Sequence, residues 1–471
     1  MSSKNQTIGY LPDERPPIWE LILFALQQIV VMFPATVLVA LITGFHVSTT
    51  IFASGLATLT FLLVTGKKIP LYYGSSFSYI TAISSIMSAE AFSNYSLNDK
   101  ISIAQFGIVM SGFVSIFAGI IIKNSGKKVI DKVLPPTVTG SIAIIIGLSL
   151  ASNAMTNASA IPEVSADKQG LAGNLAWIIA LITLISTILY SVYLKGKLSQ
   201  LPILFGLFTG YIAAVIIDAA TGIPFINLHT VTSNSVFQLP VFTLPKPSLA
   251  AVAAIMPIAI ATIPESTAHV YQLHIYVNDL AKKKGSKPYA IDDKLGLNLI
   301  GDGIGDIVSG FIGGPAGTNY GENISTMAIS RIFSVPVLIA ASIITMIIAC
   351  FTPLINAVYS IPTPVIGGLS IYLFGIIAAQ GITIMMDRKV DMFKSKNLAV
   401  IAVILIIGLG GSFGFEGGMI PMFGIQLPAI ATAAVAGILL NLLLSIGEKD
   451  DIETETNEEA VTATETITEI E

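Results

Sequence analysis

The sequence predicts an all-α polytopic membrane protein whose fourteen transmembrane segments form two inverted repeats of seven. Composition, the lengths of the apolar runs and two recurring motifs support this fold class. Of the 471 residues, 53% are hydrophobic and 11% are charged, and the mean hydropathy is +0.80. Soluble globular domains carry about 25% charged residues. The composition therefore excludes a soluble enzyme.

Apolar runs long enough to cross a bilayer, roughly 17–25 residues, follow one another along the chain. The expected segments lie near Leu21–Leu41, Ser48–Thr65, Tyr72–Met87, Ile103–Ile122, Val138–Ala154, Leu175–Tyr193, Leu201–Ala219, Ala250–Tyr271, Leu297–Ile312, Gly321–Phe333, Val335–Leu354, Val365–Met385, Leu398–Ser412 and Leu427–Leu444. The third and tenth are too short and too rich in Gly, Ser and Asn to face lipid. We expect short extended pieces followed by half-helices in both.

The positions of Lys and Arg predict the orientation, because short cytoplasmic loops hold most of these residues. With a cytoplasmic N-terminus and fourteen crossings, only Lys100, Lys168 and Lys246 of the 24 Lys and Arg fall outside. We therefore expect a multi-pass protein of the cell membrane with both termini in the cytoplasm. The basic loops act as orientation signals and imply no nucleic-acid partner. The polar N-terminus lacks the features of a secretory signal, so the first apolar run is a retained span.

Two motifs recur between the halves of the chain. A Pro-x3-Gly-x6-Gly pattern begins at Pro136 in the fifth segment and again at Pro364 in the twelfth. A glycine, two small polar residues and an aromatic occupy Gly74–Phe77 in the third segment and Gly317–Tyr320 in the tenth. Seven segments per repeat is an odd number, so the second copy is inverted. Inverted repeats with interrupted helices near the midplane are typical of secondary transporters.

Three ionisable residues stand out within apolar segments: Glu265 and His269 in the eighth, and Glu322 at the start of the tenth. A charge at this depth costs at least a few kcal/mol. Glu265 and His269 are four residues apart, so they share one helix face and can share or relay a proton. The structural alternative is a hydrogen-bonded pair that only fixes the helix. Pro264 should loosen the turn before Glu265.

The Gly-Gly-Pro-Ala-Gly run at Gly313–Gly317 prevents a regular helix, so the tenth half-helix should begin near Gly321. Its free N–H groups and positive dipole end would then point to the membrane centre. The repeat predicts the same near Ser76 and Phe77. Phe77 and Tyr320 would offer a stacking surface beside these donors. Planar, aromatic, hydrogen-bonding ligands fit such a site.

Other polar residues are assigned to supporting roles. Gln27 and Gln28 in the first segment either support the site or hydrogen-bond between helices. We expect Asp302 and Asp306 near the cytoplasmic end of the ninth segment, as structural or gating groups. No spacing of His, Cys and acidic residues suggests a metal site. The single cysteine, Cys350, cannot form an intrachain disulfide.

The Gly-Glu-Asn-x7-Arg motif from Gly321 to Arg331 resembles the signature of the nucleobase-ascorbate transporters, the second type of nucleobase:cation symporter. The similarity extends to Gly74–Phe77, Leu134–Gly140, Pro362–Gly368 and the Glu265/His269 pair, and covers nearly the whole membrane portion. Glu322-Asn323, in place of Gln-Asn, resembles the uracil permease branch. Gln27-Gln28 departs from the Gln-His common in the family, and Ser325 and Ser330 replace the signature's glycine and threonine.

The resemblance implies a core domain of segments 1–4 and 8–11 and a gate domain of segments 5–7 and 12–14. The expected boundaries are 1–17 for a cytoplasmic N-terminal tail, 18–134 and 248–360 for the core, 135–247 and 361–446 for the gate, and 447–471 for a disordered acidic cytoplasmic tail.

The resemblance also implies roles for the site residues. Glu265 and Glu322 would bind the edge of a uracil ring, with backbone donors at Phe77 and Gly321. Ser76 and Tyr320 would complete the binding site, and His269 would assist proton coupling together with Glu265. The supporting residues would be Gln28, Asn323 and Arg331.

The sequence therefore predicts proton-coupled uptake of uracil by elevator-type alternating access, without a cofactor. Uracil is neutral at physiological pH, so its accumulation requires a coupled ion, and sodium stays an alternative to the proton. Relatives form dimers through gate domains, so a homodimer is expected. A xanthine or urate permease is the nearest alternative. An anion transporter of the same architecture conflicts with Glu265 and Glu322, and a membrane-embedded enzyme would need a nucleophile or a metal cluster.

Overall fold

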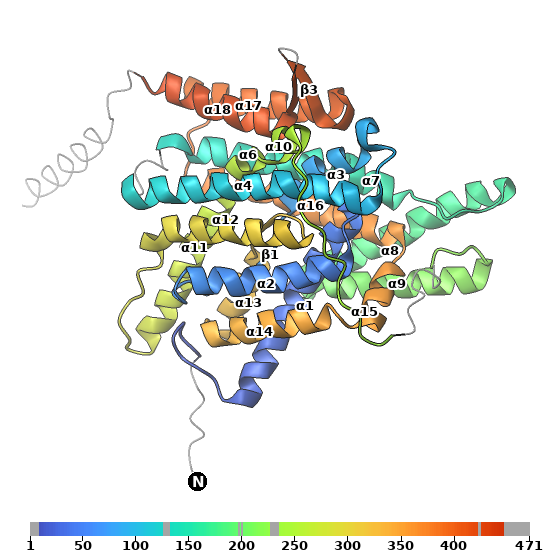
Figure 1. Ribbon diagram of the computed structural model, residues 1–471, viewed down its shortest axis with the longest axis horizontal. Helices are drawn as coiled ribbons and strands as arrows, with labels where there is room; N and C mark the ends of the chain where they lie inside the picture. Colours follow the sequence, from blue (N-terminus) through green and yellow to red (C-terminus); the bar gives the residue numbers. More distant parts are fainter. Residues whose placement is uncertain are drawn as a thin grey trace, which may run out of the picture.

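The computed structural model describes residues 9–125, 132–195, 198, 201–226, 235–422 and 425–446 (Figure 1). The expected disordered tail at 447–471 and residues 1–8 of the expected N-terminal tail lie outside the described residues. The apolar segments fold as helices, because a helix satisfies its own backbone hydrogen bonds in lipid.

Within these residues, ten helical stretches are long and apolar enough to cross a membrane. They are α1 (Ile18–Thr43), α2 (Val47–Val64), α4 (Leu97–Ser125), α6 with α7 (Pro136–Ser149 and Ala151–Ala158), α8 (Gln169–Tyr193), α9 (Pro202–Thr221), α10 with α11 (Leu249–Ile255 and Ile258–Lys283), α12 (Leu295–Ile312), α16 (Thr363–Asp387) and α17 (Ser395–Gly414). These helices confirm the expected multi-pass membrane protein.

The remaining helices are shorter. They are α3 (Ile80–Ser88) with the preceding 3-10 turn η1 (Phe77–Tyr79), α13 (Gly321–Ser330), α14 (Val335–Ile348), α15 (Thr352–Tyr359) and α18 (Ala429–Leu444). Every one of the fourteen expected ranges contains a helical segment, but the third, tenth, eleventh and fourteenth are shorter than a full span. The count of fourteen crossings therefore stays a prediction.

The helices pack in two groups. In the first, α4, α12, α2 and α14 lie side by side in that order, as Figure 1 shows, and α1 packs against α14 and α2. In the second, α16 packs against α6, α7 and α8, while α17 packs against α18 and α6. The backbones of α4 and α12 touch at a pair of glycines. A Cβ on Gly303 would lie 2.3 Å from the Gly112 carbonyl oxygen, and one on Gly112 would lie 2.4 Å from that of Gly303.

Two short antiparallel sheets interrupt the helices. β1 (Tyr73–Ser75) pairs with β2 (Gly317–Asn319), and β3 (Met419–Met422) pairs with β4 (Ile425–Pro428). The first pair lies in the third and tenth expected segments, directly before η1 and α13. The extended pieces expected there are confirmed. The second hairpin follows the thirteenth expected segment and ends directly before α18.

The eighth segment differs from the expectation in two ways. Its chain breaks between α10 and α11 at Met256 and Pro257, while α11 continues through Pro264. The loosened turn expected before Glu265 does not interrupt the helix, and the loosening itself stays a prediction. Pro264 is buried, and a packed helix can tolerate the loss of one backbone bond. Helix α11 also extends beyond Tyr271 to Lys283, because hydropathy marks only the apolar part of a helix.

The glycine contact between α4 and α12 makes a prediction about stability. Gly303→Ala should lower the midpoint of thermal unfolding in detergent, because its Cβ overlaps the α4 backbone and overpacking costs about 1–3 kcal/mol. Gly410→Ala in α17 is the matched control, since a Cβ there meets nothing within 4 Å. Equal midpoints for the two variants would contradict the close approach of α4 and α12.

Candidate functional site

The pairing of β1 with β2 joins the two interrupted segments. Tyr73 lies opposite Asn319, Gly74 opposite Thr318, and Ser75 opposite Gly317. The ladder continues on both sides, because Ser76 N donates to Ala316 O at 2.9 Å and Tyr320 N donates to Tyr72 O at 3.0 Å. Each strand runs directly into a helix start. The two helix N-termini are therefore held beside each other, as the repeat predicted.

The two helix starts are capped differently. Ser76 Oγ accepts from Ser78 N at 3.3 Å and so caps η1. Tyr320 is the N-cap residue of α13, but its side chain makes no capping hydrogen bond. The first N–H groups of an α-helix have no partner within the helix, and its N-terminus carries partial positive charge. The start of α13 at Gly321 can therefore donate to a ligand.

Helix α11 lies across both helix starts. Ser78 Oγ, from η1, is 3.5 Å from Glu265 Oε2, a long contact. One turn later, His269 packs against the start of α13: a Cβ on Gly321 would lie 2.8 Å from His269 Nε2. The backbone of Asn319 is also a hydrogen-bond neighbour of the His269 ring. His269 Nδ1 is buried without a partner among the described residues.

Glu322 completes the group as the second residue of α13. It is exposed, and it lies close enough to Glu265 for the two carboxylates to interact electrostatically. The structure thus brings Glu265, His269, Glu322 and the α13 N-terminus close together. Carboxylates accept hydrogen bonds and helix N–H groups donate them. A ligand with alternating donors and acceptors on one edge would match both.

Phe77 and Tyr320, expected to form one stacking surface, have different surroundings. Phe77 is partly buried and meets Phe374 of α16 edge to face, with ring centroids 6.1 Å apart. Tyr320 is only 3% exposed. Its hydroxyl donates to Ser75 O at 3.0 Å and lies 2.9 Å from Thr36 Oγ1. The Tyr320 ring packs over Gly74, where a Cβ would lie 2.5 Å from it. In this conformation the accessible aromatic is Phe77.

The expected supporting residues lie at two places. Asn323 Nδ2 donates to Gln28 Oε1 at 2.8 Å and to Gln28 O at 3.0 Å, which ties α13 to α1 beside the site. Arg331 is the left-handed C-cap of α13, with φ 58°. The helix rise puts it about 14 Å from Glu322. Its backbone oxygen accepts from Tyr10 N at 2.9 Å. The structure does not bring Arg331 into the site, and its role stays a prediction.

Two acidic residues of α12 lie elsewhere than the sequence predicted. Asp302 and Asp306 lie in the middle of α12, against the strands, rather than near its cytoplasmic end. Asp302 accepts from Ser266 Oγ at 2.7 Å and from Asn319 Nδ2 at 3.1 Å. It therefore ties α11 and β2 to α12. Asp302 and Asp306 are four residues apart and so share one helix face, which was the sequence signal that they could contact the same neighbouring elements.

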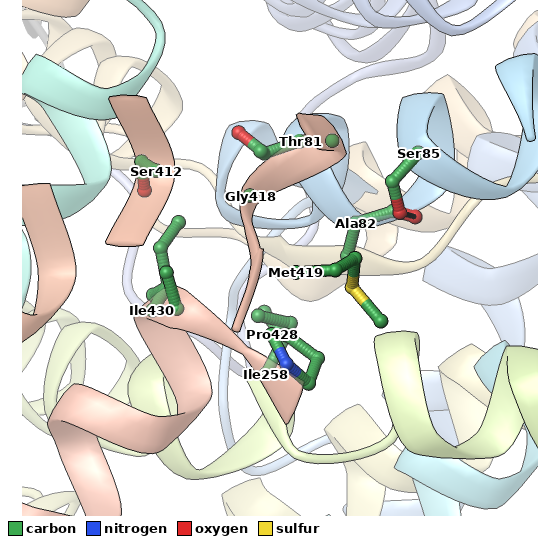
Figure 2. A pocket seen from close by; sticks show the side chains of 11 residues that line it. Thr81, Ala82, Ser85, Ile258, Ser412, Gly418, Met419, Pro428 and Ile430 are labelled. Carbon is green, nitrogen blue, oxygen red and sulfur yellow. Dashed lines mark hydrogen bonds between the residues drawn. The ribbon is translucent and has the colours of Figure 1, made fainter. Parts of the chain in front are cut away.

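Two cavities lie away from Glu265, His269 and Glu322. One of about 360 Å³ is lined by the N-terminal half of α1, including Gln27, and by Leu198 and Leu201 before α9. The other, with space for about 10 Å³, is the recess in Figure 2. There α3, at Thr81 and Ser85, faces Gly418 and the β3–β4 hairpin. Among the described residues, no group of three His, Cys, Asp or Glu side chains could hold a metal ion.

Comparisons with known sequences agree with the resemblance noted above. A family model described as "Permease family" (Xan_ur_permease) matches residues 19–417. The uracil permease of Bacillus caldolyticus is 36% identical, covering 92% of this chain and 94% of that protein. The uracil permease of Bacillus subtilis is 34% identical, covering 96% and 99%. That of Escherichia coli strain K12 is 32% identical, covering 92% and 93%.

Solved structures share the fold at low sequence identity. Murine Slc26a9, an anion transporter in the inward-facing state, superposes with a TM-score of 0.64 at 12% identity, covering 95% of this chain and 73% of that one. The transmembrane domain of the cyanobacterial bicarbonate transporter BicA gives a TM-score of 0.57 at 13% identity, covering 91% and 99%. These similarities show the architecture alone.

The Gln28–Asn323 contact makes a prediction for a double-mutant cycle. Gln28→Leu and Asn323→Leu should each lower the thermal midpoint, because each removes the hydrogen bond between the two buried amide side chains, at a cost of about 1–3 kcal/mol. The double variant should lose less than the sum of the two single losses. Thermal unfolding in detergent measures all four proteins. Additive losses would show that the two amides do not act as a pair.

Proposed function

Because this chain belongs to the permease family of nucleobase transporters, we propose that it carries uracil across the cell membrane. Members of this family are transporters rather than enzymes. Relatives named uracil permease align over nearly the whole chain, which supports the choice of substrate. The proposal includes a multi-pass protein with both termini in the cytoplasm, its fourteen segments arranged as two inverted repeats of seven.

The observation that carries this proposal is the proximity of Glu265 and Glu322 at the α13 N-terminus. Uracil presents ring N–H donors and carbonyl acceptors along its edge. Its N–H groups would donate to the two carboxylates, while backbone N–H groups near Gly321 and Phe77 would donate to its carbonyls. Such a site discriminates strongly, because a ligand lacking one of these groups leaves buried polar atoms unpaired. Phe77 would contact the ring face.

The same residues support coupling to a proton. Glu265 and Glu322 repel each other when both are ionised, and taking up a proton relieves this repulsion. His269 lies one helical turn from Glu265 and also contacts Gly321, so it sits where a proton could pass between the two helices. Coupling allows a neutral substrate to be concentrated. Without a coupled ion the protein could only equilibrate uracil.

We further propose that transport is a movement of a core domain, residues 18–134 and 248–360, against a gate domain, residues 135–247 and 361–446. The two packing groups of helices support this division. The core carries Glu265, Glu322 and both strands, while the gate contributes Phe374 opposite Phe77. A gate-to-gate homodimer is part of the same proposal, because it would hold the gate still while the core moves.

The recess beside α3 suggests which side of the site is closed. In the proposed orientation, α3 and the β3–β4 hairpin nearly close the outer side, with space for about 10 Å³ between them. Figure 2 shows this outer closure, with Ser85 and Thr81 turned toward the hairpin. We infer that this conformation opens to the cytoplasm. In the opposite conformation, α3 would separate from the hairpin.

Replacement of either carboxylate tests the proposed site. Glu265→Gln and Glu322→Gln should abolish accumulation of labelled uracil in proteoliposomes with an imposed pH gradient. Each substitution removes an acceptor for the ring N–H groups and a group that can exchange protons. Glu90→Gln, at an exposed position between α3 and α4, is the matched control and should transport normally. The proposal fails if both site variants still concentrate uracil. Competition of uracil uptake by purines tests the alternative substrates. The effect of added sodium on uracil uptake in the same assay tests the alternative coupling ion.

A reversible crosslink tests the outer closure. A Cβ on Gly417 would lie 3.6 Å from Ser85 Cβ, within the roughly 3.5–4.5 Å that a disulfide requires. In a Cys350→Ala background, Ser85→Cys with Gly417→Cys should form a disulfide under oxidation and stop uracil uptake, because α3 could no longer leave the hairpin. A reductant should restore uptake. The single-cysteine variants are the controls, and normal transport by fully crosslinked protein would refute the movement.

A further inference from the structure

Asp306 of α12 accepts hydrogen bonds from both β1 and β2. Its Oδ1 accepts from the Tyr73 hydroxyl of β1 at 2.6 Å and from Gly317 N of β2 at 2.7 Å. Asp306 is 2% exposed and Tyr73 is 1% exposed, so this contact is sealed from solvent. Tyr73 and Gly317 are the first residues of β1 and β2, and they are 244 residues apart in the sequence. A single carboxylate oxygen thus joins three elements: α12, β1 and β2.

The surrounding backbone is shaped to hold the Tyr73 ring. A Cβ on Gly317 would lie 2.3 Å from this ring, and a Cβ on Gly305 of α12 would lie 2.8 Å from it. Phe61 of α2 stacks on the ring, with centroids 6.2 Å apart and an angle of 12° between the planes. The ring therefore occupies a slot between α12 and β2 that only glycines leave open. Its hydroxyl can reach Asp306 because of this slot.

Asp306 cannot act by touching a ligand at the site. Its bonds point to the strand backbone and to Tyr73, and it is buried on the α12 side of the crossing. An acidic side chain at membrane depth carries a large desolvation cost. An apolar residue would avoid this cost but would leave the Gly317 N–H and the Tyr73 hydroxyl without this acceptor. The contact therefore fixes the positions of β1 and β2 relative to α12.

We propose that Asp306 is a positioning residue for substrate binding. It fixes β1 and β2 against α12, so that the starts of η1 and α13, one following each strand, converge on the same substrate. It does so as a hydrogen-bond acceptor through one oxygen, and it does not carry the coupling proton. The inference rests on the proposed function for its substrate, but the contact itself is independent of which ligand binds.

Three variants separate acceptor, charge and packing. Asp306→Asn keeps an Oδ1 acceptor and removes the charge. Asp306→Leu removes the acceptor, and Tyr73→Phe removes one donor while its ring keeps the slot filled. Uracil uptake is measured in proteoliposomes across a series of pH values. The Asn variant should keep the apparent KM within about twofold and retain the wild-type pH profile. The Leu and Phe variants should raise the apparent KM about tenfold with a smaller change in maximal rate, because misplaced binding groups weaken binding.

Amide hydrogen exchange of residues 313–321 provides a readout that needs no substrate and also covers a Leu variant that transports poorly. Protection of the Gly317 amide should fall in the Leu variant and be retained in the Asn variant. Loss of proton-driven accumulation by the Asn variant, with downhill uptake intact, would overturn the proposal by making Asp306 a proton carrier. Unchanged KM and unchanged exchange in the Leu and Phe variants would also overturn it. Failure of wild-type protein to take up uracil would instead contradict the proposed substrate, and the exchange result would still decide the role of Asp306.

Discussion

Backbone pairing inside the membrane is the constraint on which the rest of the structure depends. An extended segment in lipid must find partners for its N–H and C=O groups, because no water is present to bind them. β1 and β2 pair with each other, and Thr58 of α2 serves the outer edge of β1: its Oγ1 donates to Tyr73 O at 2.7 Å and accepts from Tyr73 N at 3.1 Å. Once the strands are paired, the helices that follow them must begin side by side.

Two pairs of carboxylates lie near β1, β2 and the helix starts that follow them, and the two pairs differ in how fully they are hydrogen-bonded. Asp302 and Asp306 each accept from several donors, including Ser266, Asn319 and Gly317. Glu265 has one long contact from Ser78 among the described residues, and Glu322 is exposed. A carboxylate with few hydrogen bonds within the protein keeps acceptor capacity for a ligand or a proton. The saturated pair holds the strands, and the unsaturated pair is the one that we propose for the ligand.

The sequence predicted the features that depend on local chemistry. The glycine-rich run before Tyr320 indicated a helix break, and Gly321 is the first residue of α13. The strand register, the burial of Tyr320 and the slot for Tyr73 depend on contacts between residues far apart in the chain, which no local pattern records. Pro264 shows the same limit, because packing around α11 overrides its local tendency to break the helix. Asp302 and Asp306 were visible as acids, but their partners were not.

The shared architecture with anion transporters separates what the fold supplies from what the side chains supply. Two helix N-termini facing one space attract negative charge in any sequence, because their free N–H groups carry partial positive charge. In this chain Glu265 and Glu322 place two carboxylates at those same ends. They would repel an anion and leave the helix N–H groups for neutral acceptors such as carbonyl oxygens. On the proposed function, selectivity for a neutral ligand with N–H donors would follow from two residues on α11 and α13, on a scaffold whose helix N-termini by themselves favour anions.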